Sequence, residues 1–272
     1  MPLSTAVLPD GRTIHCVNPY EVDFSAHEIF SEDVSAYGLD MPPDGIYVDV
    51  GANIGLFSLY LAGKCPQATV YAFEPMPAAF AALKLNVAEF APSVAPFLLG
   101  LGASPGVVEF DYYPAITALS TCRKETGIEL AGGIRKLLYS AAPGEAIGQI
   151  LDKTGATELR EGADFAERLF RVEKVQAKID TLSNQIAALE IERIDLLKID
   201  TEGNENDVLA GIAEADWPKI RQLLVEVHLG KDELERIVED LGRRGFRSRT
   251  GDHPMSRDGA SVYHIYATRA GG

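Results

Sequence analysis

The sequence predicts an α/β protein built on a doubly wound, mostly parallel sheet. Short apolar stretches alternate with helical stretches along most of the chain, which is the pattern of right-handed βαβ units. Two further stretches near the C-terminal end are joined by a turn-rich link that suits an antiparallel hairpin. We therefore expect a seven-stranded sheet of five parallel strands and a closing antiparallel pair. Sheets of this kind bind a nucleotide where the strand order reverses.

Residues 1–44 precede the expected sheet. Within them, residues 5–17 read as a small hairpin that turns at Asp10-Gly11, a dipeptide typical of tight turns. Residues 20–37 have a helical pattern, and a stretch rich in proline and glycine ends it before the sheet begins. We expect this hairpin and helix to cover the site of the domain.

The sheet and its helices follow in order. Strands are expected at 46–50, 69–73, 95–99, 194–199 and 221–227, helices at 55–63, 77–89, 204–215 and 231–243, and the closing pair at 245–250 and 261–268. Residues 106–112 are apolar and β-branched enough to form one more strand. The helix at 231–243 has charges on one face and apolar residues on the other, so we expect it to lie on the surface.

Residues 113–176 interrupt this alternation. They are long, polar and helix-leaning, with repeated glycines and no parallel-strand pattern. Such a length inside a compact domain is typical of an insertion. We expect a helical lid that recognises the substrate, with a solvated decoration as the alternative. The whole chain, residues 1–272, then forms a single domain.

Composition excludes several classes of partner. The net charge of −15 and the pI near 4.8 disfavour nucleic acid and anionic membrane surfaces. Three cysteines without a CxxC pattern indicate reduced thiols rather than disulfides. We find no signal peptide and no apolar run of the ~20 residues that a membrane span needs. A cytoplasmic protein is expected, with a homo-oligomer left open.

The stretch 47–58, YVDVGANIGLFS, predicts the first half of a ligand site. Gly51 lets a backbone approach a ligand closely, and Gly55 lets the following helix pack on the strand. A pyrophosphate would favour the spacing G-x-G-x-x-G, whereas here Asn53 offers a hydrogen-bonding amide and Asp49 would repel a phosphate. A ligand with a sulfonium, an ammonium and a carboxylate suits this loop better, and S-adenosylmethionine is such a ligand.

Glu74 supplies a second element of the same site. It ends the expected strand at 69–73, twenty-three residues after Gly51, which is near the distance for an acid that binds ribose hydroxyls. Because NAD uses the same kind of acid, only the combination with the glycine spacing favours S-adenosylmethionine.

Three motifs give these features a family context. The segments VDVGANIGLFSL, VYAFEPMPAAFAALKLN and DLLKIDTEGNENDVLAGI, followed by EVH, resemble the signatures of FkbM-type S-adenosylmethionine-dependent methyltransferases. The resemblance spans roughly residues 40–250. It implies a class I methyltransferase fold, which is Rossmann-like, and methylation of a hydroxyl on a small natural product such as a polyketide, a macrolide or a sugar. It also extends the expected cofactor site to Pro75.

Two positions depart from the pattern of that family. The segment 181–183 reads Thr-Leu-Ser where an acid is common at the third place, so the role of that acid is absent or moved. Asn204 stands where a small residue is usual, beside the expected site. A weaker resemblance, FDYYPAITALST at 110–121, points to members from antibiotic pathways.

Four polar residues follow two of the expected strands at their carboxyl ends, where a doubly wound sheet holds its ligands. They are Asp200, Glu202, Glu226 and His228. His228 is our first candidate for the general base, because an imidazole titrates near neutral pH. Asp200 and Glu202 are the rival bases, and Glu226 is expected to support its neighbours or bind substrate. We assign no chemistry to Lys198.

Oxygen ligands at this edge also suit Mg²⁺, through Asp200, Glu202 and Glu226. No His-x-His spacing or dense cluster demands an ion, so we predict no metal and leave a divalent cation as the less favoured alternative. Tyr37, Tyr112, Tyr113 and Phe30 are candidates for the wall of an acceptor pocket, with simple packing as the alternative.

Three other functions were weighed against an O-methyltransferase acting on a small-molecule hydroxyl. An NAD(P)-dependent oxidoreductase is disfavoured by the glycine spacing and by the lack of a Tyr-x-x-x-Lys set. A non-enzymatic relative is disfavoured by the acids at both strand ends. An N-methyltransferase on the same fold stays open, since an amine needs the same geometry and less help from a base.

Overall fold

The computed structural model describes residues 3–31, 34–123, 127–128, 131–132, 170–252 and 262–269. The N-terminal elements are β1 (Ser4–Val7), β2 (Thr13–Cys16), α1 (Pro19–Ser31) and the 3-10 turn η1 (Val34–Tyr37). The first half of the sheet region holds β3 (Ile46–Val50), α2 (Leu56–Lys64), β4 (Thr69–Phe73), α3 (Pro77–Phe90), β5 (Val94–Phe97), β6 (Gly100–Leu101), β7 (Gly106–Tyr112) and η2 (Thr117–Leu119). The second half holds β8 (Glu173–Asp180), α8 (Leu182–Ala188), β9 (Leu196–Ile199), α9 (Glu205–Ala210), η3 (Trp217–Lys219), β10 (Gln222–Val227), α10 (Lys231–Arg243), β11 (Phe246–Asp252) and β12 (Tyr263–Arg269).

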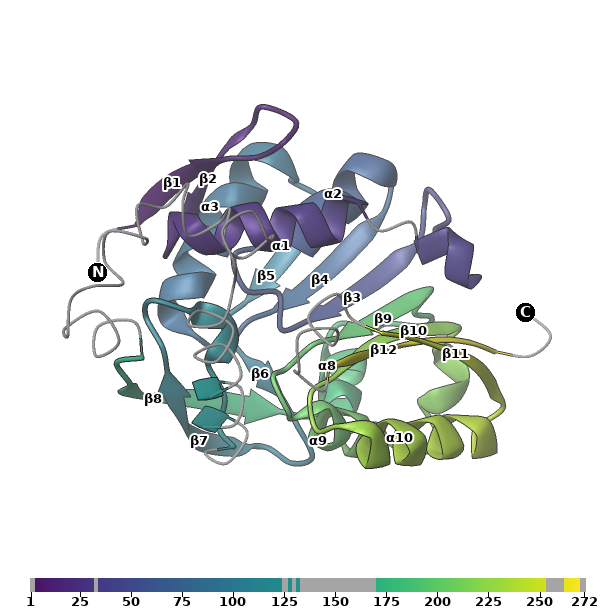
Figure 1. Ribbon diagram of the computed structural model, residues 1–272. Helices are drawn as coiled ribbons and strands as arrows, with labels where there is room; N and C mark the ends of the chain where they lie inside the picture. The colour runs from purple at the N-terminus through teal and green to yellow at the C-terminus, as the bar shows by residue number, and fades with distance from the viewer. Residues whose placement is uncertain are drawn as a thin grey trace.

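The described strands build a seven-stranded sheet in the order β11-β12-β10-β9-β3-β4-β5. From β5 to β10 the neighbours are parallel, and β12 runs antiparallel to both β10 and β11. The predicted fold class is therefore confirmed, including the five parallel strands and the closing pair. Because β3 lies between β4 and β9, the loops that follow these three strands meet at one edge of the sheet (Figure 1).

Helices cover both faces of this sheet. In Figure 1, α1, α2 and α3 lie on one side of it, and α8, α9 and α10 lie on the other. Each parallel strand is apolar on both faces: on β3, Tyr47 belongs to the core beneath α2 and α3, whereas Val48 belongs to the core on the opposite face. Burial on two faces explains why these strands read as continuous apolar runs instead of alternating patterns.

The N-terminal hairpin is anchored to α3 through Asn86, a fully buried side chain. Its amide oxygen accepts the backbone N–H of His15 at 2.7 Å, and its amide nitrogen donates to the carbonyls of His15 and Ile54, both at 2.9 Å. This pairing, together with the predicted turn at Gly11 (φ 88°), fixes the hairpin and leads the chain into α1.

Two predicted helices differ in extent. The stretch 20–37 forms α1 and a separate 3-10 turn instead of one helix, and residues 32–33 between them lie outside the described part. The helix expected at 204–215 ends at Ala210. Gly211 follows it and packs against the backbone of Gly102, where an added Cβ would lie 2.1 Å from the carbonyl oxygen. Close backbone packing therefore ends a helix that periodicity alone would extend.

The predicted strand at 106–112 exists as β7, but it lies outside the main sheet. It pairs antiparallel with β8, and β6 pairs parallel with β8, which gives a second sheet of three described strands in the order β6-β8-β7. The predicted insertion thus ends earlier than expected, because its last residues, 173–176, belong to β8. Residues 133–169, the bulk of the expected helical lid, lie outside the described residues, so the lid stays a prediction.

Candidate active site

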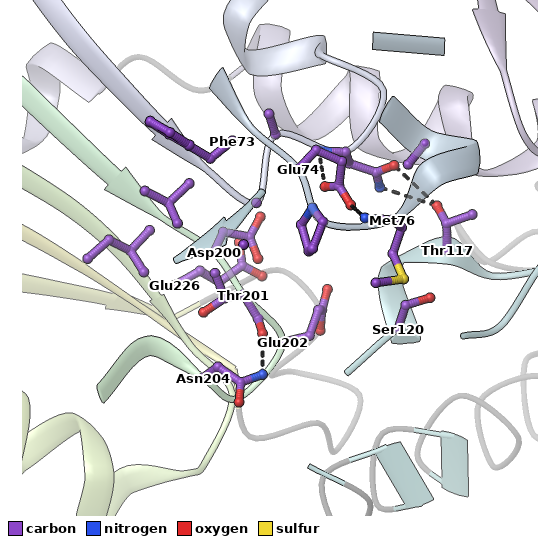
Figure 2. A pocket seen from close by; sticks show the side chains of 18 of the residues that line it. Phe73, Glu74, Met76, Thr117, Ser120, Asp200, Thr201, Glu202, Asn204 and Glu226 are labelled. Carbon is purple, nitrogen blue, oxygen red and sulfur yellow. Dashed lines mark hydrogen bonds between the residues drawn. The ribbon is translucent and has the colours of Figure 1, made fainter. Parts of the chain in front are cut away.

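A cavity of about 510 Å³ opens at the carboxyl ends of the parallel strands. Its walls come from α1, from the loops after β3, β4, β9 and β10, from η2, and from the start of β12. Figure 2 looks into it: Glu74 and Met76 stand on one wall, and Asp200, Thr201 and Glu226 stand on another. Since α1 contributes lining residues, the N-terminal segment forms one wall of this site.

The loop after β3 is shaped by glycine at two places. Gly51 adopts φ 78°, and an added Cβ would lie 1.7 Å from the carbonyl oxygen of Asp200, so the two strand ends touch through backbone. Gly55 adopts φ 94° at the start of α2, where a Cβ would lie 2.7 Å from Leu83. Asn53 between them is also left-handed, with φ 49°, which asparagine tolerates better than most residues. Gly51 and Asn53 line the cavity, whereas Gly55 does not.

Glu74 occupies the tip of β4 and is buried. Its carboxylate accepts the backbone N–H groups of Asn53 and Met76, each at 2.8 Å, and thereby joins the loops after β3 and β4. Burial raises the pKa of this carboxyl to about 7, although the two backbone donors oppose the shift. Pro75, next in the chain, lines the same wall.

Asp49 does not lie on the cavity wall, contrary to its predicted place in the cofactor site. Its carboxylate is fully buried, accepts a hydrogen bond from Ser58 at 2.7 Å and lies 3.5 Å from the ammonium of Lys198. Asp49 belongs to β3 itself and not to the loop that begins at Gly51. Its carboxylate therefore contacts Ser58 and Lys198 beneath that loop and does not reach the cavity wall.

Lys198 has a role that the sequence reading missed. Its ammonium donates to the carbonyl of Gly51 at 3.2 Å and to the carboxylate of Asp200 at 3.0 Å. Burial would lower the pKa of this lysine, but the carboxylates of Asp200 and Asp49 raise it above its ordinary value. A lysine inside an apolar strand, followed two residues later by an acid, was the signal that the sequence offered.

The predicted catalytic residues come together around His228. Its Nε2 lies 3.2 Å from a carboxylate oxygen of Glu202 and 3.2 Å from one of Glu226, and its Nδ1 lies 3.1 Å from Glu205. Glu226 also lies 3.4 Å from His264 of β12. Asp200 lines the cavity beside this group. Asp200, Glu226 and His228 each have one atom that could bind a metal ion, and these three atoms lie within 4.8 Å of one another.

Burial and ion pairing set the protonation states of this cluster. Burial disfavours a charged imidazole, but Glu202, Glu205 and Glu226 together raise the pKa of His228 well above its ordinary value. Burial raises the pKa of both Glu202 and Asp200. For Glu226 burial acts in the same direction, yet the hydrogen bonds from the histidines lower its pKa well below the usual range. The raised pKa favours the protonated imidazole near neutral pH, so His228 would have to lose this proton before it could act as the predicted general base.

Glu205 is the second residue that the sequence reading missed. It belongs to the first turn of α9, is 1% exposed, and accepts backbone N–H groups of Thr201 and Gly203 as well as facing His228. An acid just inside a helix start is usually a helix cap, so no sequence pattern connects it with a histidine 23 residues away.

The expected acceptor-binding tyrosines lie elsewhere. Tyr37 stacks on Tyr266 with ring centroids 4.0 Å apart. Tyr112 and Tyr113 are buried at the end of β7 and just after it. None of the three predicted tyrosines is among the described residues that line the cavity, although Val108 and Phe110 of β7 do line it. Of the substrate candidates, Glu226 alone faces the cavity; Phe30 packs against Tyr60 instead.

Comparisons with known proteins place this architecture in a family. The profile described as the methyltransferase FkbM domain matches residues 49–248. The chain is 33% identical to the 31-O-demethyl-FK506 methyltransferase FkbM of Streptomyces tacrolimicus, covering 99% of this chain and 98% of that protein. It is 32% identical to the methyltransferase sdnD of Sordaria araneosa, covering 86% of each. It is also 35% identical to the AMB antimetabolite synthetase AmbE of Pseudomonas aeruginosa over 97% of this chain, which spans only 12% of that much longer protein.

The matched region contains the loop after β3, the acid at the tip of β4 and the cluster after β9 and β10. It decides against the oxidoreductase alternative, since the shared family is one of methyltransferases. Among the described residues, no helix has both the length and the apolar character to cross a bilayer. With its sheet order, its glycine loop and its profile match, the chain belongs to the family of FkbM-domain methyltransferases.

Proposed function

We propose that this chain transfers the methyl group of S-adenosylmethionine to a hydroxyl oxygen of a small natural product. One observation carries the proposal: a single cavity joins the glycine loop and Glu74 to the carboxylate and histidine cluster around His228. The first part suits a nucleoside with an amino-acid tail, and the second suits an acceptor that must lose a proton. The relatives FkbM and sdnD, both named as methyltransferases, support this direction.

The described residues fit S-adenosylmethionine. The carboxylate oxygens of Glu74 each accept one backbone N–H and keep a second lone pair for a ribose hydroxyl. Gly51 leaves no side chain between the loop backbone and the cavity. Asp200, Glu202 and Glu226 line the cavity, and the pKa of Glu226 is lowered by the histidines, so this wall carries negative charge that suits a sulfonium and an ammonium better than a phosphate. S-adenosylmethionine supplies an activated methyl group, and S-adenosylhomocysteine is left after transfer.

The hydroxyl proton passes, in our proposal, to a carboxylate instead of to His228. In this proposal His228 keeps its proton, and Glu202, which lines the cavity 3.2 Å from Nε2 of the histidine and whose pKa burial raises, takes the hydroxyl proton in its ionised form. A carboxylate of raised pKa is a better general base than an ordinary one. The imidazolium then holds the orientation of Glu202 and Glu226. Asp200 is the rival base, although it is bound to Lys198.

The charge of this cluster also favours O-methylation of an uncharged hydroxyl. A carboxylic acid acceptor would arrive as an anion next to Asp200, Glu202 and Glu226 and be repelled by them. N-methylation is the second candidate, because the same carboxylates would attract an ammonium. An amine, however, would have to lose its proton before it could attack, so a hydroxyl is the better match to a site with a basic carboxylate.

Two measurements test this function. In a calorimetric titration, S-adenosylhomocysteine should bind, and Glu74→Ala should weaken binding by roughly tenfold or more, as expected for loss of charged hydrogen bonds. No heat at millimolar ligand would exclude the donor. Formation of S-adenosylhomocysteine should then be followed with 31-O-demethyl-FK506, an acceptor named for a relative, alongside a simple primary amine and a hexuronic acid.

The base is identified by matched isosteres. Glu202→Gln and Asp200→Asn keep the shape of each side chain and remove its basicity. We expect the first to lower kcat by about 100-fold or more with little change in affinity for S-adenosylhomocysteine, and the second to lower kcat less. The reverse order would make Asp200 the base.

A further inference from the structure

Glu205 lies behind the cavity and not on its wall. It is 1% exposed, and among the described residues its Oε1 faces three donors at once: Nδ1 of His228 at 3.1 Å and the backbone N–H groups of Gly203 at 2.9 Å and Thr201 at 3.3 Å. It stands in the first turn of α9, so the start of this helix holds its side chain in place. A buried carboxyl group is therefore fixed against Nδ1 of the histidine.

The opposite edge of His228 faces the cavity. Nε2 lies 3.2 Å from Glu202 and 3.2 Å from Glu226. With Nδ1 held by Glu205, the ring has one orientation in which both nitrogens meet a carboxylate. Turned over, it would present carbon atoms to the same oxygens and leave buried carboxylates without a donor, which is costly.

The backbone around Glu202 adds to this constraint. Glu202 adopts φ 51° and Gly203 adopts φ 96°, so both lie in the left-handed region. A glutamate in that conformation persists only where its surroundings hold it, and such residues gather at functional sites. Glu205 accepts the N–H groups on both sides of this turn, at Thr201 and Gly203. It thus holds His228 and the loop that carries Glu202 with one side chain.

We propose that Glu205 is a positioning residue for methyl transfer: by accepting the Nδ1–H of His228 it fixes the ring so that Nε2–H faces Glu202 and Glu226. The inference rests on the proposed function for its catalytic meaning. Carboxylates that orient a functional histidine through its second nitrogen serve in this way at other sites, where their loss costs roughly 10–100-fold in activity. A role as a helix cap alone is the competing explanation, and it predicts different results.

The first test needs no acceptor. In protein labelled with ¹⁵N-histidine and saturated with S-adenosylhomocysteine, the Nδ1–H of His228 should give a low-field proton resonance, identified by its loss in His228→Gln. We expect Glu205→Ala to abolish this resonance and Glu205→Gln to retain it at higher field, because the amide oxygen still accepts the proton without a charge. Glu233→Gln is the matched control, since Glu233 is another buried acid in the first turn of a helix, paired with Arg236.

The control should leave the resonance unchanged, and melting curves of all variants establish that they are folded. A resonance that survives Glu205→Ala would overturn the proposal. The resonance can be measured even if no acceptor is found. A failure of the positioning role of Glu205 can therefore be told apart from a failure of the proposed function.

The second test separates positioning from helix capping by a double-mutant cycle in the transfer rate to 31-O-demethyl-FK506. Glu205→Ala should lower kcat by roughly 10–100-fold with little change in affinity for S-adenosylhomocysteine, and Glu205→Gln should recover most of the loss. In a His228→Ala background the same Glu205→Ala change should cost almost nothing more. An equal cost in both backgrounds would show that Glu205 acts through the backbone loop alone and would overturn the proposal.

Discussion

At the scale of single residues, the site is organised by a contact between two backbones. Gly51 and Asp200 follow neighbouring parallel strands, and no side-chain atom fits between them. The ammonium of Lys198 donates hydrogen bonds to the carbonyl of Gly51 and to the carboxylate of Asp200. In the proposed function, these contacts hold the donor half and the acceptor half of the cavity at a fixed separation, which an in-line transfer requires.

Gly51→Ala is expected to be strongly destabilising. The left-handed conformation costs about 1–3 kcal/mol for a residue other than glycine, and the clash at 1.7 Å with the carbonyl of Asp200 forces the strand ends apart. Urea unfolding at equilibrium measures the loss. Gly63→Ala is the control: it lies within α2 with open space around it, so it should stabilise the protein by about 0.5–1 kcal/mol. Equal effects of the two changes would contradict this account.

Glu74 predicts a dependence of stability on pH. Its pKa is about 7 in the folded protein and 4.5 ordinarily, so the folded state binds more protons between these values. Stability from this group is therefore fully present below pH 4.5 and is lost as pH rises through 7, by about 3 kcal/mol in total. Glu74→Gln lacks this change. Between pH 5 and pH 8, the unfolding free energy of the wild-type protein should fall relative to that of Glu74→Gln. A difference between the two that does not change with pH would contradict the raised pKa of Glu74.

At the scale of elements, residues 115–123 form a strap across the cavity. At one end, Thr117 donates to Glu21 of α1 at 3.0 Å and lies 3.2 Å from the amide nitrogen of Asn53. At the other end, Asn204 binds the strap: its oxygen accepts from Cys122 and Arg123, and its nitrogen lies 3.3 Å from the hydroxyl of Thr121. The asparagine that departs from the family pattern is thus the anchor of this strap.

Asn204→Ala should loosen the strap. Loss of these hydrogen bonds costs about 1–2 kcal/mol, which we expect to raise the dissociation rate of S-adenosylhomocysteine by roughly tenfold. Stopped-flow displacement measures that rate. Asn184→Ala is the control, because Asn184 is an exposed asparagine bonded to Asp180 away from the cavity. If both variants release the ligand at the wild-type rate, the strap does not retain it.

At the scale of the whole molecule, the cavity joins elements from both ends of the chain. Its lining runs from Cys16 beside α1 to His264 on β12, across the loops of the parallel strands. A ligand there contacts segments that fold together only in the native state. Binding should therefore stabilise the entire domain by mass action.

Thermal unfolding provides the corresponding prediction. S-adenosylhomocysteine at about 100 times its Kd should add about 2.7 kcal/mol to the unfolding free energy and raise Tm by several degrees. NADH at the same concentration should leave Tm unchanged, because the loop after β3 lacks the glycine spacing for a pyrophosphate. Differential scanning fluorimetry measures both. A shift with NADH and none with S-adenosylhomocysteine would reverse the assignment of the donor.

The parallel sheet, the loop with Gly51 and the edge at which Glu74, Asp200 and His228 meet could all be predicted from the amino-acid sequence. These follow from local signals, since apolar runs mark strands buried on two faces and the carboxyl ends of parallel strands share one edge. Which side chains face the cavity became clear from the three-dimensional arrangement alone. Asp49 turned out to lie beneath the loop, and the three tyrosines pack outside the cavity.

Contacts between distant segments explain these differences. The separate sheet of β6, β7 and β8 depends on pairing across the long segment after β7, and the sequence of a strand does not identify its pairing partner. The roles of Lys198 and Glu205 depend on neighbours that the fold brings close, as does the raised pKa of His228, which three nearby glutamates cause. Periodicity and spacing report what a residue does within its own element, whereas charge, burial and orientation at a site are set by the residues that the fold packs against it.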